Sequence, residues 1–105
     1  MSDLDSKTYK FSGDDQLGRF HCPKTEGLAK EVAEAMEAAG IPVVWFRGMR
    51  GLDPMNDKPI SRADVAYVGA GGFVQQVCTY FPEALAPGQL EARISHCVHI
   101  AKESA

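Results

Sequence analysis

Apolar residues recur at helical spacing in two segments of the 105-residue chain. The first segment predicts an amphipathic helix from Glu26 to Ala39, because its apolar residues lie three or four positions apart. Thr25 is suited to cap the start of this helix, and Gly40 is suited to end it because glycine tolerates the left-handed conformation. The second segment has the same spacing and predicts an amphipathic helix from Gln89 to Glu103.

Shorter apolar runs predict strands outside the two helices. The run from Ile41 to Phe46 is apolar throughout, which is typical of a strand covered on both faces. Further short strands are expected at Tyr9–Phe11 and Leu17–Cys22, on either side of a turn-forming segment. We expect residues 1–7 to be a frayed tail and the glycine- and proline-rich residues 48–60 to form a loop.

Residues 61–81 admit three interpretations. In the first, strands at Asp64–Val68 and Phe73–Phe81 form a hairpin around a glycine-rich turn, since the second segment is rich in β-branched and aromatic residues. In the second, a capping box that starts at Ser61 begins one long helix, although each of three internal glycines would cost about 1 kcal/mol. In the third, a strand leads through the glycines into a helix. We adopt the hairpin.

With the hairpin, the element order is β-β-α-β-β-β-α within a single small domain, residues 1–105. This order corresponds to the α+β class, with a mainly antiparallel sheet of four to five strands and two amphipathic helices. The apolar strands show no polar face, so both faces of the sheet need cover. Two helices of about four turns cannot supply all of it, and we expect a second copy of the chain, in a homodimer, to cover the rest. The expected contact residues are Val44, Phe46, Val74 and Tyr80.

Charge and cysteine content narrow the classes of partner and compartment. The chain has 11 Lys and Arg against 14 Asp and Glu, a formal net charge of −3, whereas nucleic-acid-binding domains are usually basic. No run approaches the ~20 apolar residues of a membrane span. Three irregularly spaced cysteines do not form a disulfide framework, and the polar N-terminus lacks the apolar core of a signal peptide. We therefore expect a cytoplasmic protein that binds neither nucleic acid nor membrane.

Three motifs resemble parts of catalytic or cofactor sites, but each is incomplete. A glycine-rich stretch follows a predicted strand, yet Val74 stands where a dinucleotide fingerprint needs glycine or alanine. His96 and His99 are spaced to face one metal ion. The other pair, His21 and Cys22, is adjacent on a predicted strand, so its side chains point to opposite faces, and Cys22 has no histidine oriented toward it. The sequence therefore predicts no catalytic residue, no cofactor and no metal site.

The best candidate for a ligand site is the loop from Arg47 to Lys58. Arg47 and Arg50 place two guanidinium groups after Trp45, beside flexible backbone, and such groups match the oxygens of carboxylates and phosphates. Because no acid, base and nucleophile converge, we interpret the protein as a small non-catalytic binding or accessory protein that acts as a homodimer. The alternative is a small enzyme or a binder of anionic metabolites that uses this loop, with Trp45, Arg47, Arg50 and Lys58 as binding residues.

Overall fold

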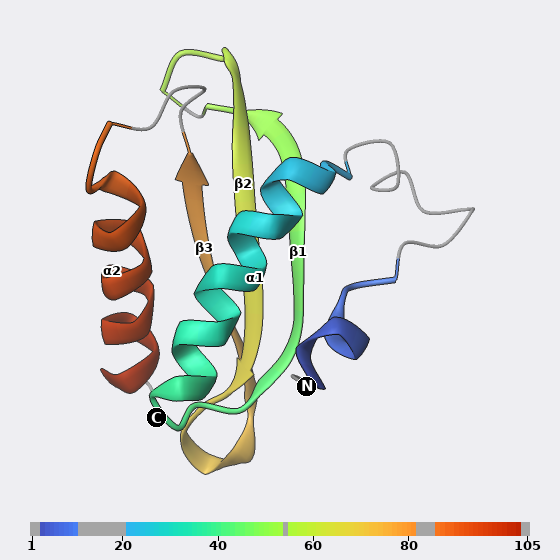
Figure 1. The fold of residues 1–105 in the computed structure, drawn as a ribbon, viewed down its shortest axis with the longest axis vertical. Helices are drawn as coiled ribbons and strands as arrows, with labels where there is room; N and C mark the ends of the chain where they lie inside the picture. Colours follow the sequence, from blue (N-terminus) through green and yellow to red (C-terminus); the bar gives the residue numbers. More distant parts are fainter. Residues whose placement is uncertain (1–2, 11–20, 54, 82–85, 104–105) are drawn as a thin grey trace.

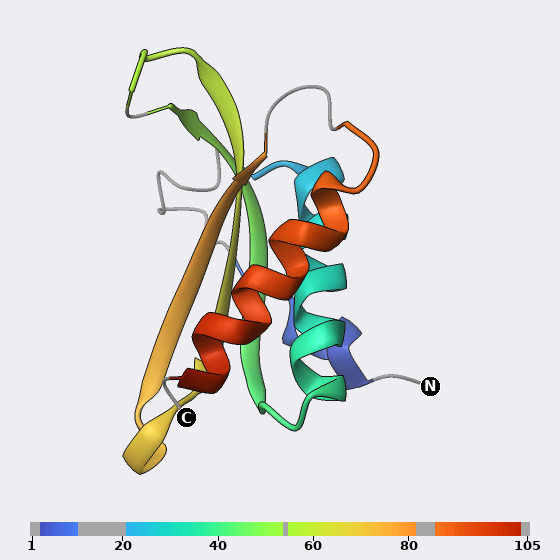
Figure 2. The ribbon, with the colours of Figure 1, turned by 90° about the vertical axis from the view of Figure 1, so that its left-hand side faces the viewer.

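The computed structural model describes residues 3–10, 21–53, 55–81 and 86–103. Within them, two helices pack on one face of a three-stranded antiparallel sheet (Figure 1, Figure 2). The strands lie across the sheet in the order in which they follow along the chain, β1-β2-β3. The elements are α1 (Pro23–Ala38), β1 (Val43–Leu52), β2 (Pro59–Val68), β3 (Val74–Phe81) and α2 (Gln89–Glu103), with short 3-10 helices at Asp3–Lys7 and Ala70–Gly72.

The α+β class is confirmed, but the sheet is smaller than the sequence predicts. The element order is α-β-β-β-α, and the described residues form three strands where four to five were expected. The difference arises before α1, where the sequence predicts two strands. No helix in the described part of the chain is long and apolar enough to cross a bilayer.

The chain before α1 contacts the outer edge of β1 at two points. Thr8 forms an isolated bridge with Phe46, and His21 forms one with Met49. Thr8 directly precedes the strand expected at Tyr9–Phe11, and His21 belongs to the strand expected at Leu17–Cys22, after which α1 begins at Pro23. Phe11 and residues 17–20, which belong to the two predicted strands, lie outside the described residues.

α1 begins at Pro23, earlier than predicted, and ends at Ala38. Proline is tolerated at the first helical position, because the N–H that it lacks would have no partner within the helix. Cys22 has an extended conformation and occupies the N-cap position that the sequence suggested for Thr25. Gly40 follows the helix with a φ angle of 84°, the left-handed conformation that was predicted there.

The segment from residue 61 to residue 81 forms the predicted hairpin. β2 and β3 pair in one register without a bulge. In the connection between them, Gly71 and Gly72 have φ angles of 72° and 81°, which glycine adopts without strain. The two helical alternatives for this segment are therefore wrong.

The expected loop at residues 48–60 is mostly strand. β1 and β2 extend into it from both sides, β1 as far as Leu52 and β2 from Pro59 onward. The pairing of β1 with β2 continues through both glycines of β1, so ladder formation outweighs the low strand propensity of glycine. Arg47 and Arg50 consequently lie on a regular strand and not on a flexible loop.

The core lies between the sheet and the two helices. The largest side chains that the strands contribute are Phe46, Tyr67 and Phe81, each 1% exposed. The sequence predicted Phe46 at a contact between subunits, whereas the structure places its side chain in the core. A register shift between Val43 and Trp45 adds one residue to β1, so that Val43 and Phe46 both face the core.

Residues 3–7, which were expected to belong to a frayed tail, form a 3-10 helix. Leu4 is 1% exposed and belongs to the core. Lys7 Nζ lies 3.0 Å from a carboxylate oxygen of Glu37 on α1. Burial of the leucine side chain offsets the entropy lost when this short segment is ordered.

Truncation of Leu4 to alanine is expected to lower the free energy of unfolding by about 2–4 kcal/mol, because a buried leucine is replaced by a cavity. Urea denaturation followed by circular dichroism measures the change. Leu52→Ala is the matched control, since Leu52 is 61% exposed and its truncation should cost less than about 0.5 kcal/mol. Equal effects of the two substitutions would show that the N-terminal segment does not contribute to the core.

Candidate functional site

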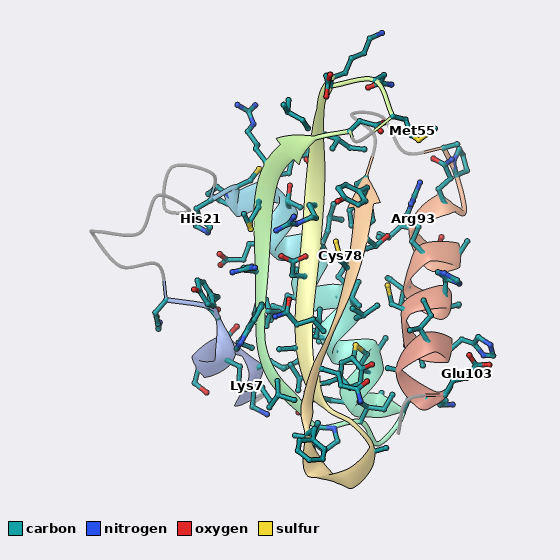
Figure 3. The ribbon with its side chains drawn as sticks, turned by 180° about the vertical axis from the view of Figure 1, so that it is seen from behind. Lys7, His21, Met55, Cys78, Arg93 and Glu103 are labelled. Atoms are coloured by element: carbon teal, nitrogen blue, oxygen red, sulfur yellow. The ribbon has the colours of Figure 1, made fainter. Side chains whose placement is uncertain are left out.

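One face of the sheet is covered by neither helix (Figure 3). Its side chains alternate along each strand with those that face the core. We define the uncovered face by Trp45, Arg47 and Met49 of β1, Arg62, Asp64 and Ala66 of β2, and Val74, Gln76, Cys78 and Tyr80 of β3. Figure 3 shows Cys78 near the middle of this face.

A buried carboxylate lies at the centre of the uncovered face. Asp64 is 2% exposed, and its Oδ2 accepts hydrogen bonds from Arg47 Nε at 2.9 Å and from Arg62 Nη2 at 3.2 Å. A carboxylate removed from water keeps its charge only where cations and hydrogen-bond donors replace the water. The two guanidinium groups supply both, and they leave one excess positive charge in the cluster.

Aromatic rings hold Arg47 in place from the outer side of β1. Its guanidinium carbon lies 4.8 Å from the ring centroid of Tyr9 and 4.8 Å from that of Trp45. The two rings are themselves 5.0 Å apart and inclined by 60°. With cation–π contacts to both rings and a hydrogen bond from its Nε to Asp64, the side chain of Arg47 is 12% exposed and held in place. It is therefore poorly placed to capture a free anion.

Cys78 completes the polar cluster from β3. It lies directly across the ladder from Asp64. Burial, together with a hydrogen bond to the Asp64 carboxylate and the charge of that carboxylate, raises the pKa of the Cys78 thiol to about 12. The thiol therefore stays protonated at neutral pH and donates its hydrogen bond, although its residue is exposed at the surface.

A different environment surrounds Cys22 at the start of α1. Its Sγ accepts a hydrogen bond from Thr25 Oγ1 at 3.2 Å. This hydrogen bond, backbone N–H groups of the first helical turn and the nearby Arg50 guanidinium lower the pKa of the Cys22 thiol. Beside it, His21 Nε2 pairs with the carboxylate of Glu26.

We expect Cys22 to react with iodoacetamide at least about tenfold faster than Cys78 at pH 7.5, because the thiolate is the reacting species. The alkylation rate of Cys22 should level off at a lower pH than that of Cys78, which should still rise at pH 10. Peptide mass spectrometry of timed samples gives both rates. Exposure alone would give the opposite order, since Cys78 is exposed and Cys22 half-buried. Faster alkylation of Cys78 would contradict the hydrogen bond to Asp64.

The structure brings together two of the four residues that were predicted to bind a ligand. Trp45 and Arg47 lie side by side on the uncovered face. Arg50 is exposed further along β1, near the start of α1, and Lys58 is exposed in the turn between β1 and β2. The four side chains therefore do not form one site.

The residues expected at a subunit contact are also separated. Val74 and Tyr80 lie on the uncovered face, while Val44 is 40% exposed at the register shift of β1. Sequence reasoning missed Arg62 and Asp64, which complete this face. The signal that could have found them is their spacing of two positions within a strand, which places both side chains on one face.

Other parts of the described chain offer little chemistry. No group of three or more His, Cys, Asp or Glu side chains in these ranges could hold a metal ion. His99 Nε2 lies 3.1 Å from the carboxylate of Glu103 on the solvent side of α2. A groove of about 290 Å³ runs between α1 and α2, and its lining residues are Ala35, Ile94, Ser95, Val98, His99 and Lys102.

The uncovered face, with its buried carboxylate, its two arginines and its aromatic rings, is the most distinctive surface of the described residues. Comparisons of this chain with family models, with curated proteins and with solved structures found no match.

Proposed function

We propose that the protein is a small non-catalytic binding protein that acts as a homodimer through its uncovered face. One observation supports this most strongly, namely the residue types on that face. Tryptophan, tyrosine, methionine and arginine are enriched where proteins associate, whereas lysine, glutamate, aspartate, serine and alanine are depleted there. The uncovered face holds all four of the enriched types, of which tryptophan, tyrosine and arginine are partly exposed and Met49 is buried. It holds no lysine, glutamate or serine, and its aspartate and alanine, Asp64 and Ala66, are buried.

The rigidity of the central side chains also favours association. Arg47 is held by two rings and by Asp64, so little of its rotamer entropy remains to be lost when a partner binds. Trp45 is half-buried before any partner is present. Side chains that are already ordered and present aromatic or guanidinium surface contribute most to binding energy.

The carboxylate and the thiol at the centre of this face are engaged, which supports a non-catalytic role, although the buried Nε of Arg62 has no hydrogen-bond partner among the described residues. The Asp64 carboxylate is engaged by two guanidinium groups, and the Cys78 thiol stays protonated because its pKa is about 12. Neither group is therefore available as a general base or a nucleophile at neutral pH.

A second copy of the chain suits this face because a two-fold contact places one patch against its own copy. Apolar surface continues from the face to the end of the β2–β3 hairpin, where Val74 is 58% exposed and Phe73 is 72% exposed. Contiguous apolar surface of this kind marks association sites on many soluble proteins. In a homodimer it would be covered together with the aromatic rings of the face.

Sedimentation equilibrium at micromolar concentration tests the homodimer. The wild-type protein is expected at twice the chain mass of 11.4 kDa. Val74→Glu is expected at the mass of one chain, because the new carboxylate would be buried against the partner. Leu52→Glu is the matched control, since Leu52 has a similar exposure of 61% but lies at the opposite end of the sheet. A single-chain mass for the wild type at every concentration would disprove the proposal.

A further inference from the structure

We propose that the edge of β3, which no other described strand covers, binds an extended polypeptide segment of a partner protein, which joins the sheet as a fourth strand. The segment carries an apolar side chain opposite Val77 and a carboxylate opposite Phe81. This binding uses the main chain at the edge of the sheet, so it is separate from the contact proposed for the uncovered face.

The hydrogen bonds of the sheet show which way the main chain of β3 points. The carbonyl of Phe46 points outward from β1, because it accepts a hydrogen bond from the Tyr9 N–H at 2.9 Å. Antiparallel pairs alternate, so Val65, which lies opposite Phe46, directs its N–H and C=O toward Val77 of β3. The alternate residues of β3 therefore direct their N–H and C=O away from the sheet, and these are Val74, Gln76, Cys78 and Tyr80.

The sequence of β3 contains none of the features that usually protect an edge. Native sheets protect such strands with charged residues, with proline, with a bulge or by covering the edge with a helix or a loop. β3 reads VQQVCTYF, with no charged residue and no proline, and it pairs with β2 without a bulge. The edge of β1, by contrast, already receives hydrogen bonds from the N–H groups of Tyr9 and Cys22. The edge of β3 thus lacks protection by its own sequence, whereas the edge of β1 is already engaged by described residues.

A polypeptide strand is the ligand that matches a row of outward N–H and C=O groups, because its own groups repeat at the same spacing. The β3 strand of a second copy contains no acidic residue, so it offers no carboxylate to a cation beside this edge. α2 packs against β3 from the helix side of the sheet (Figure 2). An extended segment that carries a carboxylate therefore fits this edge better than a second β3.

Two groups on the helix side of β3 define the side chains of the segment. Val77 and Phe81 both face the core side of the strand. The guanidinium carbon of Arg93 lies 5.8 Å from the ring centroid of Phe81, beside the end of β3 in Figure 3. A carboxylate opposite Phe81 would meet this cation, and an apolar side chain opposite Val77 would be covered by α2. Residues four apart in a strand share one face, so a single segment satisfies both conditions.

Amide hydrogen exchange, followed by NMR on dilute protein, tests whether the edge is free. The amides of Gln76, Cys78 and Tyr80 are expected to exchange rapidly, and those of Val77 and Thr79, which are bonded to β2, are expected to be protected. Protection of all five amides in dilute protein would overturn the proposal. If the amides of Gln76, Cys78 and Tyr80 become protected only as the protein concentration rises, a second copy occupies this edge. That result would overturn the proposal as well.

Binding is tested with a soluble peptide of about ten residues in which threonine alternates with valine. One glutamate replaces the valine four residues from the central valine. One version of the peptide has this glutamate on the N-terminal side of the central valine and a second version has it on the C-terminal side, so that both parallel and antiparallel pairing are tested. Gln76→Pro removes one outward N–H and is expected to abolish binding, whereas Gln76→Thr keeps the N–H and should bind like the wild type. Circular dichroism confirms that both variants are folded.

Arg93→Gln tests the carboxylate. It is expected to weaken binding of the glutamate peptide about threefold and to leave a glutamine version unchanged. Absence of binding by the wild type at millimolar peptide, or equal binding by Gln76→Pro and Gln76→Thr, would overturn the proposal. The sedimentation mass of Gln76→Pro should equal that of the wild type, which separates this edge from the homodimer contact.

Discussion

Replacement of Gly48 by alanine is expected to lower the free energy of unfolding by about 3 kcal/mol or more, because the new methyl group has no room. A Cβ at this position would lie 2.0 Å from the backbone nitrogen of Glu26 and 2.2 Å from the carbonyl carbon of Thr25. Both atoms belong to the first turn of α1, so no side chain can rotate aside, and the helix must move away from β1. The melting temperature should fall by about 10 °C or more.

Gly51→Ala is the control for this substitution. Gly51 lies on the same strand, and a Cβ there would meet nothing within 4 Å. Its replacement should change the free energy of unfolding by less than about 0.5 kcal/mol. Urea denaturation of both variants measures the difference. If the two alanine variants are equally stable, α1 does not contact β1 as closely as the structure shows.

The helices and the hairpin could be predicted because their signals are local. α2 has the bounds that its apolar spacing predicts, Gln89–Glu103. The end of α1 was found from Gly40, whose φ angle is a property of that residue alone. The start of α1 was missed because its first turn, which begins at Pro23, has no apolar periodicity and is held by contact with β1.

The length and the faces of β1 could not be predicted, because both depend on its neighbours. Gly48 suggested a loop, but the strand needs a glycine there so that α1 can approach. Strict alternation would put Val43 and Trp45 on one face of the strand. The register shift between them separates the two, so that Val43 enters the core and Trp45 joins the uncovered face.

The candidate site could be predicted only in part for the same reason. Trp45 and Arg47 were identified by residue type, since aromatic and guanidinium groups are common in binding surfaces. Asp64, the carboxylate that organises them, lies 17 positions from Arg47 along the chain. Only the pairing register of β1 with β2 brings the two together. A buried carboxylate at the centre of a face is thus a property of the sheet and not of any local pattern.

The same carboxylate leads to the second large effect. Asp64→Asn is expected to lower the free energy of unfolding by about 3 kcal/mol, because it leaves two guanidinium groups in a partly buried cluster without their counter-charge. The side chains of Arg47 and Arg62 are 12% and 31% exposed, so water can replace the carboxylate only incompletely. Urea denaturation at pH 7 measures the loss.

Glu37→Gln provides the comparison, since it removes the same charge from an ion pair at the surface. Glu37 and Lys7 lie 3.0 Å apart, but their side chains are 32% and 27% exposed, and loss of this pair should cost less than about 1 kcal/mol. A further variant, Asp64→Leu with Arg62→Met, removes one guanidinium group together with the carboxylate. It should recover part of the stability that Asp64→Asn loses, because fewer unpaired charges remain. If Asp64→Asn costs no more than Glu37→Gln, the cluster does not depend on its buried carboxylate, and Arg47 is free to bind an external anion.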